Sequence, residues 1–273
     1  MRLGISSALT TASAPEWAKA HKALGCGAVV FPFDHTADEE TIAGYAAAAR
    51  DVGLIIAEVG AWCNPVSPDA QTRRKALDRC KAQLRLADAI DARCCVNIAG
   101  AAGSLWDGAY RENYSQEHWD ATVASIREII DDVKPTRTYY TLEPMPWMIP
   151  HDPDEYLRLI QAVDRERLAV HMDLANWITN TRKLFFSNEF AQECFAKLGS
   201  LVRSCHLKDV ALAPEFTLRL LESRVGEGCV DLIEYARLAD KADPDMPMLL
   251  EHQPNDDIYK EDLRKVQEWF KEV

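Results

Sequence analysis

The sequence lacks an excess of basic residues. Its 31 Lys and Arg are outnumbered by 43 Asp and Glu, which gives a formal net charge of −12. Proteins that bind nucleic acid depend on clustered Lys and Arg to neutralise phosphates. The charge therefore argues against DNA or RNA as a partner, although it leaves room for a local basic pocket that takes a small anion.

Long apolar runs are also missing, because none approaches the roughly 20 residues that are needed to cross a bilayer. The N-terminal residues Met1–Ser6 lack the charged and long apolar regions of a signal peptide and begin directly with a strand-like pattern. We therefore expect a protein that has no membrane partner and remains in the cytoplasm.

No Cys-x-x-Cys spacing occurs among the eight cysteines. Several of them fall within predicted strands, at Cys94, Cys95 and Cys205. Cysteines in such positions are typical of small core residues that are kept reduced. We expect neither disulfides nor a zinc–thiolate site, in agreement with a cytoplasmic location.

What the chain does have is a regular alternation of short apolar runs and helical segments. With 273 residues and 48% hydrophobic residues, it can bury one sizeable core. Eight segments are predicted as strands: Arg2–Ser6, Ala28–Phe31, Leu54–Glu58, Arg93–Ile98, Thr138–Glu143, Leu168–Asp173, Val202–Leu207 and Met248–Glu251. The alternation predicts a single-domain (β/α)₈ barrel over residues 1–273. A doubly wound sheet is the alternative, but no G-x-G-x-x-G follows an early strand.

Helix signals support this reading. Apolar residues recur at helical spacing over 70–89, 115–133 and 262–270. Ser13 and Thr36, each three residues before a glutamate, predict capping boxes, while Ser67-Pro68 and Asp152-Pro153 predict a cap before a first-turn proline. His21, His35 and His118 lie in helical or loop segments, and we expect them at the surface.

The fifth to the eighth predicted strands each have, at the C-terminal end, a side chain that could act as an acid, a base or a ligand. These side chains are Glu143, Asp173, His206 and Glu251. In a (β/α)₈ barrel the C-terminal ends of all strands meet at one rim, so the four would be neighbours. Three carboxylates that lie so close would raise one another's pKa values unless a cation neutralised them. The pattern therefore predicts a divalent metal site, and its oxygen-rich ligand set suits Mn²⁺, Mg²⁺ or Co²⁺.

Other polar residues are candidates for contacts around this site. His171 shares a strand face with Asp173, and it is either a hydrogen-bonded core histidine or a contact to substrate or ligand. His252 follows Glu251 and is expected to face the other way. Arg224, in the glycine-containing loop Arg224–Gly228, either binds substrate oxygens or is a solvated loop residue.

Loop aromatics add two further hypotheses. Trp62, Trp106 and Trp147 are expected to shape the substrate pocket, although the sequence does not place them. The apolar run Leu184-Phe185-Phe186, after the sixth strand, is either a subunit contact or a lid over the site.

With these residues together, the chain resembles the xylose isomerase-like TIM barrel superfamily of sugar isomerases and epimerases, which includes ketose 3-epimerases. The resemblance covers the whole chain and is sharpest from Leu142 to Gln253. Its motifs are Leu-Glu143-Pro, Asp173, Cys-His206-Leu-Lys208-Asp, Arg224-Val-Gly-Glu-Gly and Leu-Leu-Glu251-His.

The resemblance assigns roles to these positions. It implies that Glu143, Asp173, His206 and Glu251 are metal ligands, that the two glutamates form an acid/base pair, and that Arg224 binds substrate. One departure stands out, because the ketose epimerases carry a substrate-binding histidine where this chain has Asn176. His171 or Lys208 is then a candidate replacement contact. A homo-oligomer is expected by the same resemblance.

These residues predict a metal-dependent sugar isomerase or epimerase that works through an enediolate, with Mn²⁺ as the favoured ion. The same site could serve a lyase or dehydratase that acts on 3-oxo-glycosides or inososes, because those reactions begin with the same proton abstraction. A sugar-binding barrel without turnover is the non-enzymatic alternative. The apurinic-site endonucleases of the superfamily use extra histidines on earlier strand ends, which this chain lacks.

Overall fold

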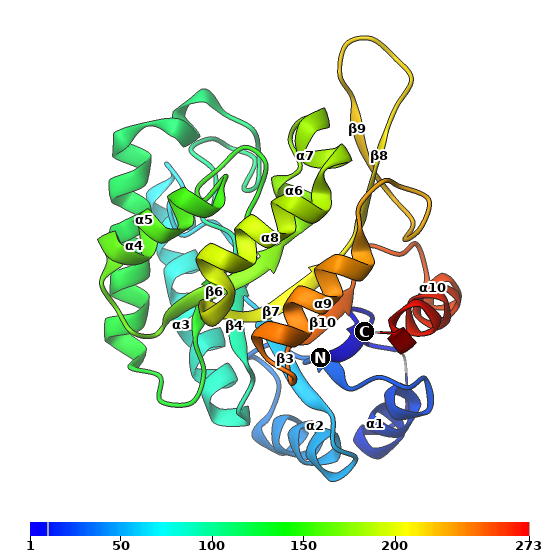
Figure 1. Ribbon diagram of the computed structural model, residues 1–273. Coiled ribbons are helices and arrows are strands. Elements are labelled where there is room, and N and C mark those ends of the chain that lie inside the picture. Colours follow the sequence, from blue (N-terminus) through cyan, green and yellow to red (C-terminus); the bar gives the residue numbers. More distant parts are fainter. Residues whose placement is uncertain (10, 273) are drawn as a thin grey trace.

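Eight parallel strands close into a barrel in the computed structural model, which describes residues 1–9 and 11–272 (Figure 1). The order around the barrel is β1-β10-β7-β6-β5-β4-β3-β2, and β1 pairs with both β2 and β10 to complete the ring. The strands are β1 (Arg2–Ile5), β2 (Ala28–Val30), β3 (Ile55–Gly60), β4 (Cys94–Asn97), β5 (Tyr140–Leu142), β6 (Leu168–Asp173), β7 (Val202–Leu207) and β10 (Pro247–Leu250). The (β/α)₈ prediction is confirmed, and β6 and β7 have the predicted bounds.

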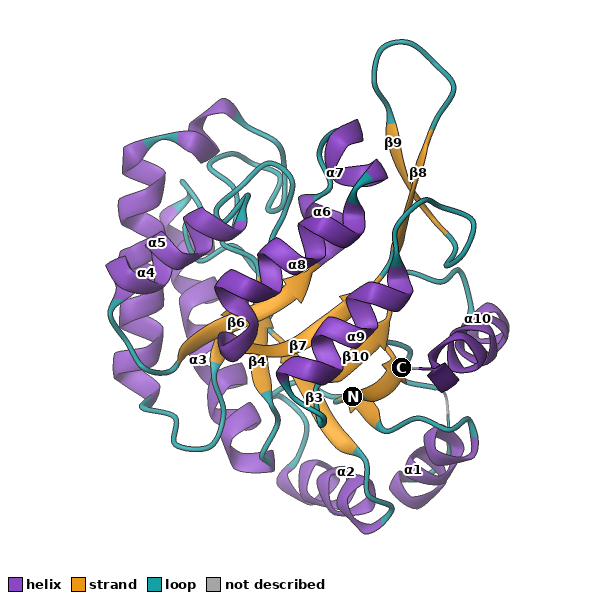
Figure 2. Cartoon of the chain, viewed as in Figure 1, coloured by secondary structure: helices purple, strands orange, loops and turns teal. Residues whose placement is uncertain are grey.

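Helices surround the barrel and cover its strands (Figure 2). They are α1 (Ala14–Ala23), α2 (Glu39–Asp51), α3 (Ala70–Ile90), α4 (Gln116–Val133), α5 (Pro153–Val163), α6 (Leu174–Trp177), α7 (Thr181–Phe185), α8 (Ser187–Leu198), α9 (Leu232–Ala242) and α10 (Asp256–Trp269). Three short 3₁₀ helices are η1 (Arg111–Tyr114), η2 (Gly199–Leu201) and η3 (Phe270–Glu272). No helix in the described residues is long and apolar enough to span a bilayer.

Most of the helices begin directly after a residue whose side chain accepts a backbone N–H of the first turn. The Asp152 cap is confirmed, since its carboxylate accepts the N–H of Glu155 at 2.7 Å. Two other predictions were wrong: Asp38, not Thr36, caps α2, and Asp69, not Ser67, caps α3. An aspartate nearer the first turn reaches the free N–H groups of that turn, so it displaces the earlier hydroxyl. Ser13 precedes α1 as predicted, but its side chain makes no capping bond.

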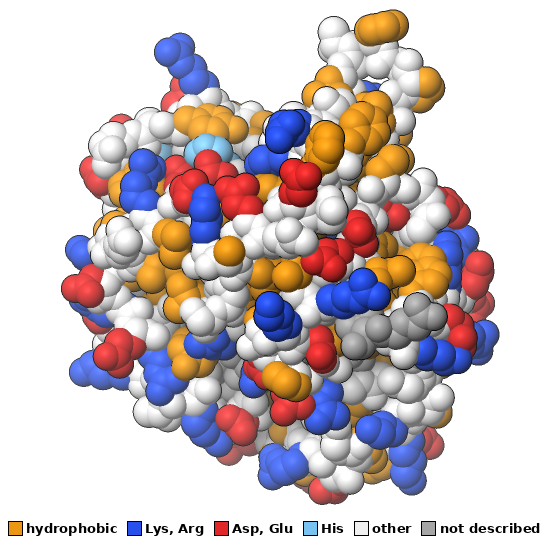
Figure 3. Space-filling view, viewed as in Figure 1, with side chains coloured by type: hydrophobic (Ala, Val, Ile, Leu, Met, Phe, Trp, Pro, Cys, Tyr) orange, Lys and Arg blue, Asp and Glu red, His pale blue; other side chains and the backbone are white. Residues whose placement is uncertain are grey.

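Two elements near the C-terminus differ from the prediction. Helix α10 starts six residues before residue 262, because the side chain of Asn255 accepts the N–H groups of Asp257 and Ile258. The segment after β7 forms an unpredicted antiparallel hairpin, β8 (Asp209–Leu212) and β9 (Leu220–Ser223). This hairpin projects beyond the helices (Figure 1), and its side chains include exposed apolar groups (Figure 3). Phe216, in the turn of the hairpin, is fully exposed.

Two histidines that were expected at the surface lie in the core instead. His21 and His118 are buried, contrary to expectation, and each ring contacts a backbone carbonyl, Trp17 O at 3.0 Å and Gly100 O at 3.1 Å. They lie on helix faces that pack toward the barrel, where a hydrogen-bonded imidazole is tolerated. His35 is half-buried against Gln83.

Small residues allow the strands and thiols to pack closely. A Cβ added to Gly4 in β1 would lie 2.2 Å from the carbonyl oxygen of Ala28 in β2, so only glycine fits there. All eight cysteines are free, and Cys94, Cys95 and Cys205 are buried in strands as predicted. Leu184 is buried, whereas Phe185 at the end of α7 and Phe186 after it are exposed.

Candidate metal centre

The four strand-end residues meet at the C-terminal end of the barrel. Glu143 follows β5, Asp173 ends β6, His206 lies next to the end of β7 and Glu251 follows β10. These four strands are consecutive neighbours in the barrel. One nitrogen or oxygen atom from each side chain lies within 4.8 Å of the corresponding atoms of the other three. The arrangement is compact enough for all four to share one ion.

The Nδ1 atom of His206 lies among the carboxylates. It is 3.0 Å from Glu251 Oε2, 3.3 Å from Glu143 Oε1 and 3.7 Å from Asp173 Oδ2. Asp173 and His206 are fully buried, and Glu143 is 6% exposed. Three carboxylates in such a dry position need a neutralising cation.

Lys208 provides positive charge at this position. Its Nζ lies 2.6 Å from Asp173 Oδ2, 3.2 Å from Glu251 Oε2 and 3.6 Å from Glu143 Oε1. Asp173 Oδ2 and Glu251 Oε2 nevertheless accept no hydrogen bond of acceptable geometry, although both are buried. One ammonium group cannot balance three carboxylates, and this hard, oxygen-rich set fits a divalent cation.

Burial and charge shift the pKa values of the cluster in opposite directions. Burial raises the pKa of Glu143. Burial also acts to raise the pKa of Glu251, but the charges of His206 and Lys208 outweigh it and lower this pKa to about 2. Burial likewise opposes the ionisation of His206, yet the carboxylates around it raise its pKa well above the usual value. The same burial thus has opposite outcomes for the two glutamates, because Glu251 is closer to the positive charge of His206 than Glu143 is.

Asn176 joins the cluster through Glu143. Its Nδ2 donates to Glu143 Oε1 at 3.1 Å and to Pro144 O at 3.0 Å, while its backbone N–H donates to Asp173 Oδ1 at 3.1 Å. Lys208 Nζ is 3.5 Å from Asn176 Oδ1. The predicted residues Asn176 and Lys208 therefore lie at the site and link two of the four strand-end residues.

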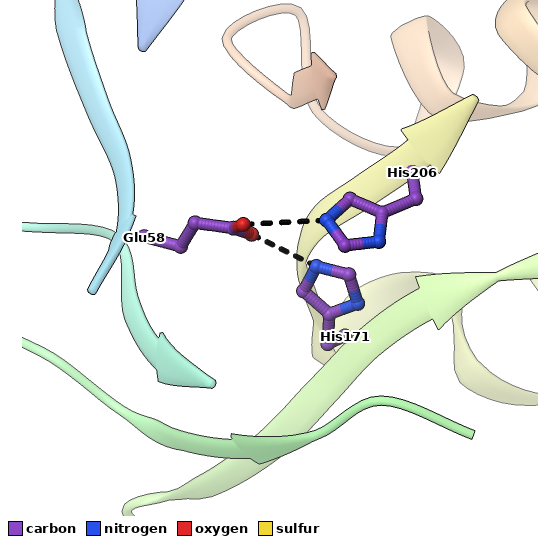
Figure 4. A group of neighbouring side chains, drawn as sticks. All are labelled: Glu58, His171 and His206. Atoms are coloured by element: carbon purple, nitrogen blue, oxygen red, sulfur yellow. Dashed lines mark hydrogen bonds and ion pairs between the residues drawn. The ribbon is translucent and has the colours of Figure 1, made fainter. Parts of the chain in front are cut away.

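Glu58, on β3, is a member of the site that sequence reasoning missed. It crosses to the other side of the barrel, where its two oxygens contact His206 Nε2 at 3.2 Å and His171 Nε2 at 2.9 Å (Figure 4). Glu58, His171 and His206 form a second group whose ligand atoms lie within 4.8 Å of one another. A glutamate in the apolar strand Ile55–Gly60 was the available signal.

This contact orients the imidazole of His206. When Nε2 carries the hydrogen that Glu58 accepts, the lone pair of Nδ1 points toward Glu143, Asp173 and Glu251. His171 is fully buried, and its Nδ1 has no partner among the described residues. Of the two roles open to His171, the structure supports a buried contact to Glu58, beneath the cluster.

A cavity of about 610 Å³ opens above the cluster, and we call it the mouth cavity. Trp62, Trp106 and Trp147 line it, together with Ile98 and Met145. No arginine is among the described residues that line it. Its ionisable residues are Lys208, His252 and five carboxylates, Glu58, Asp107, Glu143, Glu222 and Glu251. The mouth cavity is therefore acidic, with an aromatic wall.

Two predicted residues have different surroundings from those expected. His252 lines the mouth cavity instead of facing away, because β10 ends at Leu250 and His252 adopts a left-handed backbone conformation with φ 56°. Its Nδ1 lies 3.0 Å from Glu222 Oε2. Arg224 is not among the residues that line the cavity; it forms an ion pair with Asp262 at 2.6 Å.

The glycine-containing loop beside Arg224 folds around a carboxylate. The N–H groups of Gly226 and Gly228 donate to Asp209 Oδ2 at 2.8 and 3.0 Å. A Cβ on Gly228 would lie 2.2 Å from Asp209 Oδ1. The close backbone approach that glycine permits here thus serves an internal aspartate.

Known proteins share this fold. A sequence model of the family described as "Xylose isomerase-like TIM barrel" matches residues 17–273. No curated protein matches the chain. A xylose isomerase-like TIM barrel protein from Mycobacterium smegmatis in complex with magnesium is similar at 18% identity, with 96% of this chain and 90% of that chain covered and a TM-score of 0.68.

Two further solved structures cover the chain completely. One is D-psicose 3-epimerase from Clostridium cellulolyticum with D-tagatose, at 14% identity, 99% coverage of that chain and a TM-score of 0.72. The other is endonuclease IV from Thermus thermophilus, at 13% identity, 100% coverage of that chain and a TM-score of 0.76. At these identities the likeness establishes the fold alone.

Proposed function

The chain belongs to the xylose isomerase-like TIM barrel family, and from this premise we propose that it is a divalent-metal-dependent isomerase or epimerase of uncharged sugars. The observation that carries the proposal is the buried group Glu143, Asp173, His206 and Glu251. Its oxygen-rich composition favours Mn²⁺, with Mg²⁺ or Co²⁺ as alternatives.

The composition of the mouth cavity supports an uncharged substrate. Five carboxylates line it, and the one lysine is already paired with three of the buried acids. A phosphorylated sugar or a nucleic-acid phosphate would meet repulsion there, because no arginine among the described lining residues offers a forked contact. Trp62, Trp106 and Trp147 supply flat apolar surface for the C–H face of a sugar ring.

The reaction needs a proton to leave a carbon next to a carbonyl group. A divalent ion in this site would polarise the carbonyl oxygen and stabilise the negative charge that develops as the proton leaves. One of the two glutamates, Glu143 or Glu251, removes the proton, and the other returns one. Asn176 holds Glu143 in place, and Lys208 balances part of the negative charge of the carboxylates.

Elimination is the second candidate function. It begins with the same proton abstraction but ends when a leaving group departs, as in a lyase on 3-oxo-glycosides or a dehydratase on inososes. The wide aromatic wall around the mouth cavity favours it, because three tryptophans offer more stacking surface than one ring covers. Product analysis separates elimination from epimerisation.

The test is exchange of a substrate C–H for solvent deuterium, followed by NMR with Mn²⁺ supplied. Ketoses, 3-oxo-glycosides and inososes serve as substrates, with sugar phosphates as a charged comparison set. We expect exchange with an uncharged substrate and a loss of about 10²–10⁴-fold in Glu143→Gln and in Glu251→Gln.

The matched control is Glu166→Gln, which neutralises an exposed carboxylate just before β6, at the opposite end of the barrel from the mouth. Its exchange rate should equal that of the wild type. Undiminished exchange in both mouth variants would refute the two-carboxylate mechanism. Sugar binding without any exchange in the wild type would favour a sugar-binding barrel that has no turnover.

A further inference from the structure

A second cavity of about 590 Å³ lies at the N-terminal ends of the strands, and we call it the base cavity. Its walls include the start of β3 (Ile55, Ile56), the residues before β4 (Ala92, Arg93) and those before β5 (Arg137, Tyr139). Helix α2 and the end of α3 complete it. It is therefore distinct from the mouth cavity, which lies at the other end of the same strands.

Arginine dominates the charge of the base cavity. Four guanidinium groups line it, from Arg50, Arg93, Arg137 and Arg203, against two carboxylates, Asp91 and Asp243. Four positive and two negative groups give a local charge of +2, although the whole chain carries −12. A cluster of positive charge in a protein whose net charge is strongly negative indicates a local role for these arginines.

Contacts within the protein use only part of the donor capacity of these arginines. Arg203 donates through one terminal nitrogen to Ser200 O and Val202 O, and Arg137 donates once to Ala89 O. Arg93 pairs with Asp243, but its Nε is buried without a partner. Arg50 makes no side-chain hydrogen bond or ion pair with the described residues. Since each guanidinium carries five N–H donors, most of these donors face the cavity or solvent.

The rest of the lining is apolar and aromatic. Leu54, Ile56 and Ile90 form apolar wall, and the guanidinium of Arg203 stacks 4.2 Å from the ring centroid of Tyr139. Stacking fixes the plane of that guanidinium, so its free edge is held ready for a planar, forked contact. The volume is in the range of small-molecule sites.

We propose that the base cavity binds a small phosphorylated metabolite, with the phosphate on the arginines and the organic part against the apolar wall. A phosphate monoester carries about −1.5 to −2 charges at neutral pH, which matches the local charge of +2. Guanidinium groups recognise phosphate oxygens through paired N–H donors.

The experiment is calorimetric titration of the whole protein with glucose 6-phosphate, inorganic phosphate and glucose, with and without EDTA. EDTA removes any metal ion at the mouth that could itself hold phosphate. We expect saturable binding of glucose 6-phosphate and weaker binding of phosphate, both unchanged by EDTA. With EDTA present, glucose should bind more weakly than glucose 6-phosphate, because it lacks the phosphate that the arginines contact. Because the contacts are ionic, affinity should fall as sodium chloride is raised.

Variants connect the binding to this cavity. Arg50→Gln and Arg203→Gln should each weaken glucose 6-phosphate binding about tenfold, the scale of one charge-assisted hydrogen bond. Arg50→Gln breaks no contact with the described residues, so it tests binding without disturbing the fold. The matched control is Arg264→Gln, an exposed arginine on α10, which should bind as the wild type does. Absence of saturable binding, or equal weakening in all three variants, would overturn the proposal.

Discussion

The two ends of the barrel use the same strands for opposite electrostatic purposes. At the C-terminal end, five carboxylates surround an aromatic cavity that contains one lysine and no described arginine. At the N-terminal end, four arginines and two aspartates surround a cavity of similar volume. Charge is therefore segregated along the barrel axis: the surroundings at the C-terminal end suit a cation, and those at the N-terminal end suit an anion.

Burial also differs between the two ends. At the mouth, Asp173, His206 and Glu58 are almost completely buried, so their charges interact strongly and must be balanced. At the base, Arg93 and Asp243 retain about 30% of their side-chain exposure, so water screens them. The mouth therefore depends on buried ion pairs, whereas the base presents arginine N–H groups that remain partly exposed to water.

The largest expected effect is on stability at the mouth. Glu58→Gln keeps the shape of the side chain but removes the charge that faces His206 and His171, so we expect a loss of about 3–5 kcal/mol. The corresponding change at the base, Asp243→Asn, should cost about 1 kcal/mol or less, because its ion pair is partly exposed. Urea denaturation with a common m-value measures both. If both substitutions lowered the free energy of unfolding equally, burial would not distinguish the charges at the two ends.

Metal affinity provides the next test. Asp173→Asn removes one of the four proposed ligands, and we expect Mn²⁺ affinity to fall at least about 100-fold, beyond the effect of losing a residue that only supports a ligand. Asp91→Asn, which neutralises an exposed acid of the base cavity, should leave Mn²⁺ affinity unchanged. Titration of metal-free protein by calorimetry gives both values. A metal ion that binds equally well to both variants would lie outside the mouth cluster.

A smaller effect is expected from the lysine at the mouth. The ammonium of Lys208 lies among the carboxylate oxygens that a metal ion would use, so it competes for them. Lys208→Met should therefore raise the apparent Mn²⁺ affinity about tenfold, the value of one charge-assisted hydrogen bond. Weaker Mn²⁺ binding in this variant would mean that Lys208 supports the metal site instead of competing with it.

The smallest effect concerns a loop at the base. Asp88 accepts the N–H groups of Thr136, Arg137 and Thr138. Although burial acts to raise its pKa, these three donors lower the pKa below its usual value. Such a group stabilises the fold above the unfolded carboxyl pKa of about 4, and this contribution is lost as pH falls toward the folded pKa.

We therefore expect Asp88→Asn to cost about 1 kcal/mol at neutral pH, discounted for partial exposure, and much less near pH 2. The melting temperature of variant and wild type across pH 2–7 measures this. A cost that stays constant with pH would mean that the carboxylate charge contributes nothing.

The sequence predicted those parts of the site that depend on local pattern. Strand alternation and the residue at each strand end were enough to bring Glu143, Asp173, His206 and Glu251 to one rim, since a closed barrel converges them whatever the loops do. Contacts across the barrel were not predictable in this way. Glu58 meets His206 only because closure places β3 opposite β7, and no spacing along the chain encodes that distance.

Loops and helix faces limited the prediction in a different manner. Arg224 pairs with Asp262 on α10, and although Asp262 was part of the predicted helix, nothing in the sequence indicates that this helix packs beside the loop after β9. The base cavity combines residues at or just before the start of β3, β4, β5 and β7 with residues of α2 and α3, and no pattern along the sequence brings them together. Each of its arginines, taken alone, has the pattern of an ordinary surface residue.

The contact between Glu58 and His206 has a consequence for how such a barrel could be divided and recombined. All four proposed ligands come from the half of the chain after residue 140, whereas the carboxylate that orients His206 comes from the half before it. A chimera that joined this second half to the first half of another barrel would keep all four proposed ligands but would lose the contact that orients His206. The hybrid would be functional only if the other barrel carried an acid at the position of Glu58.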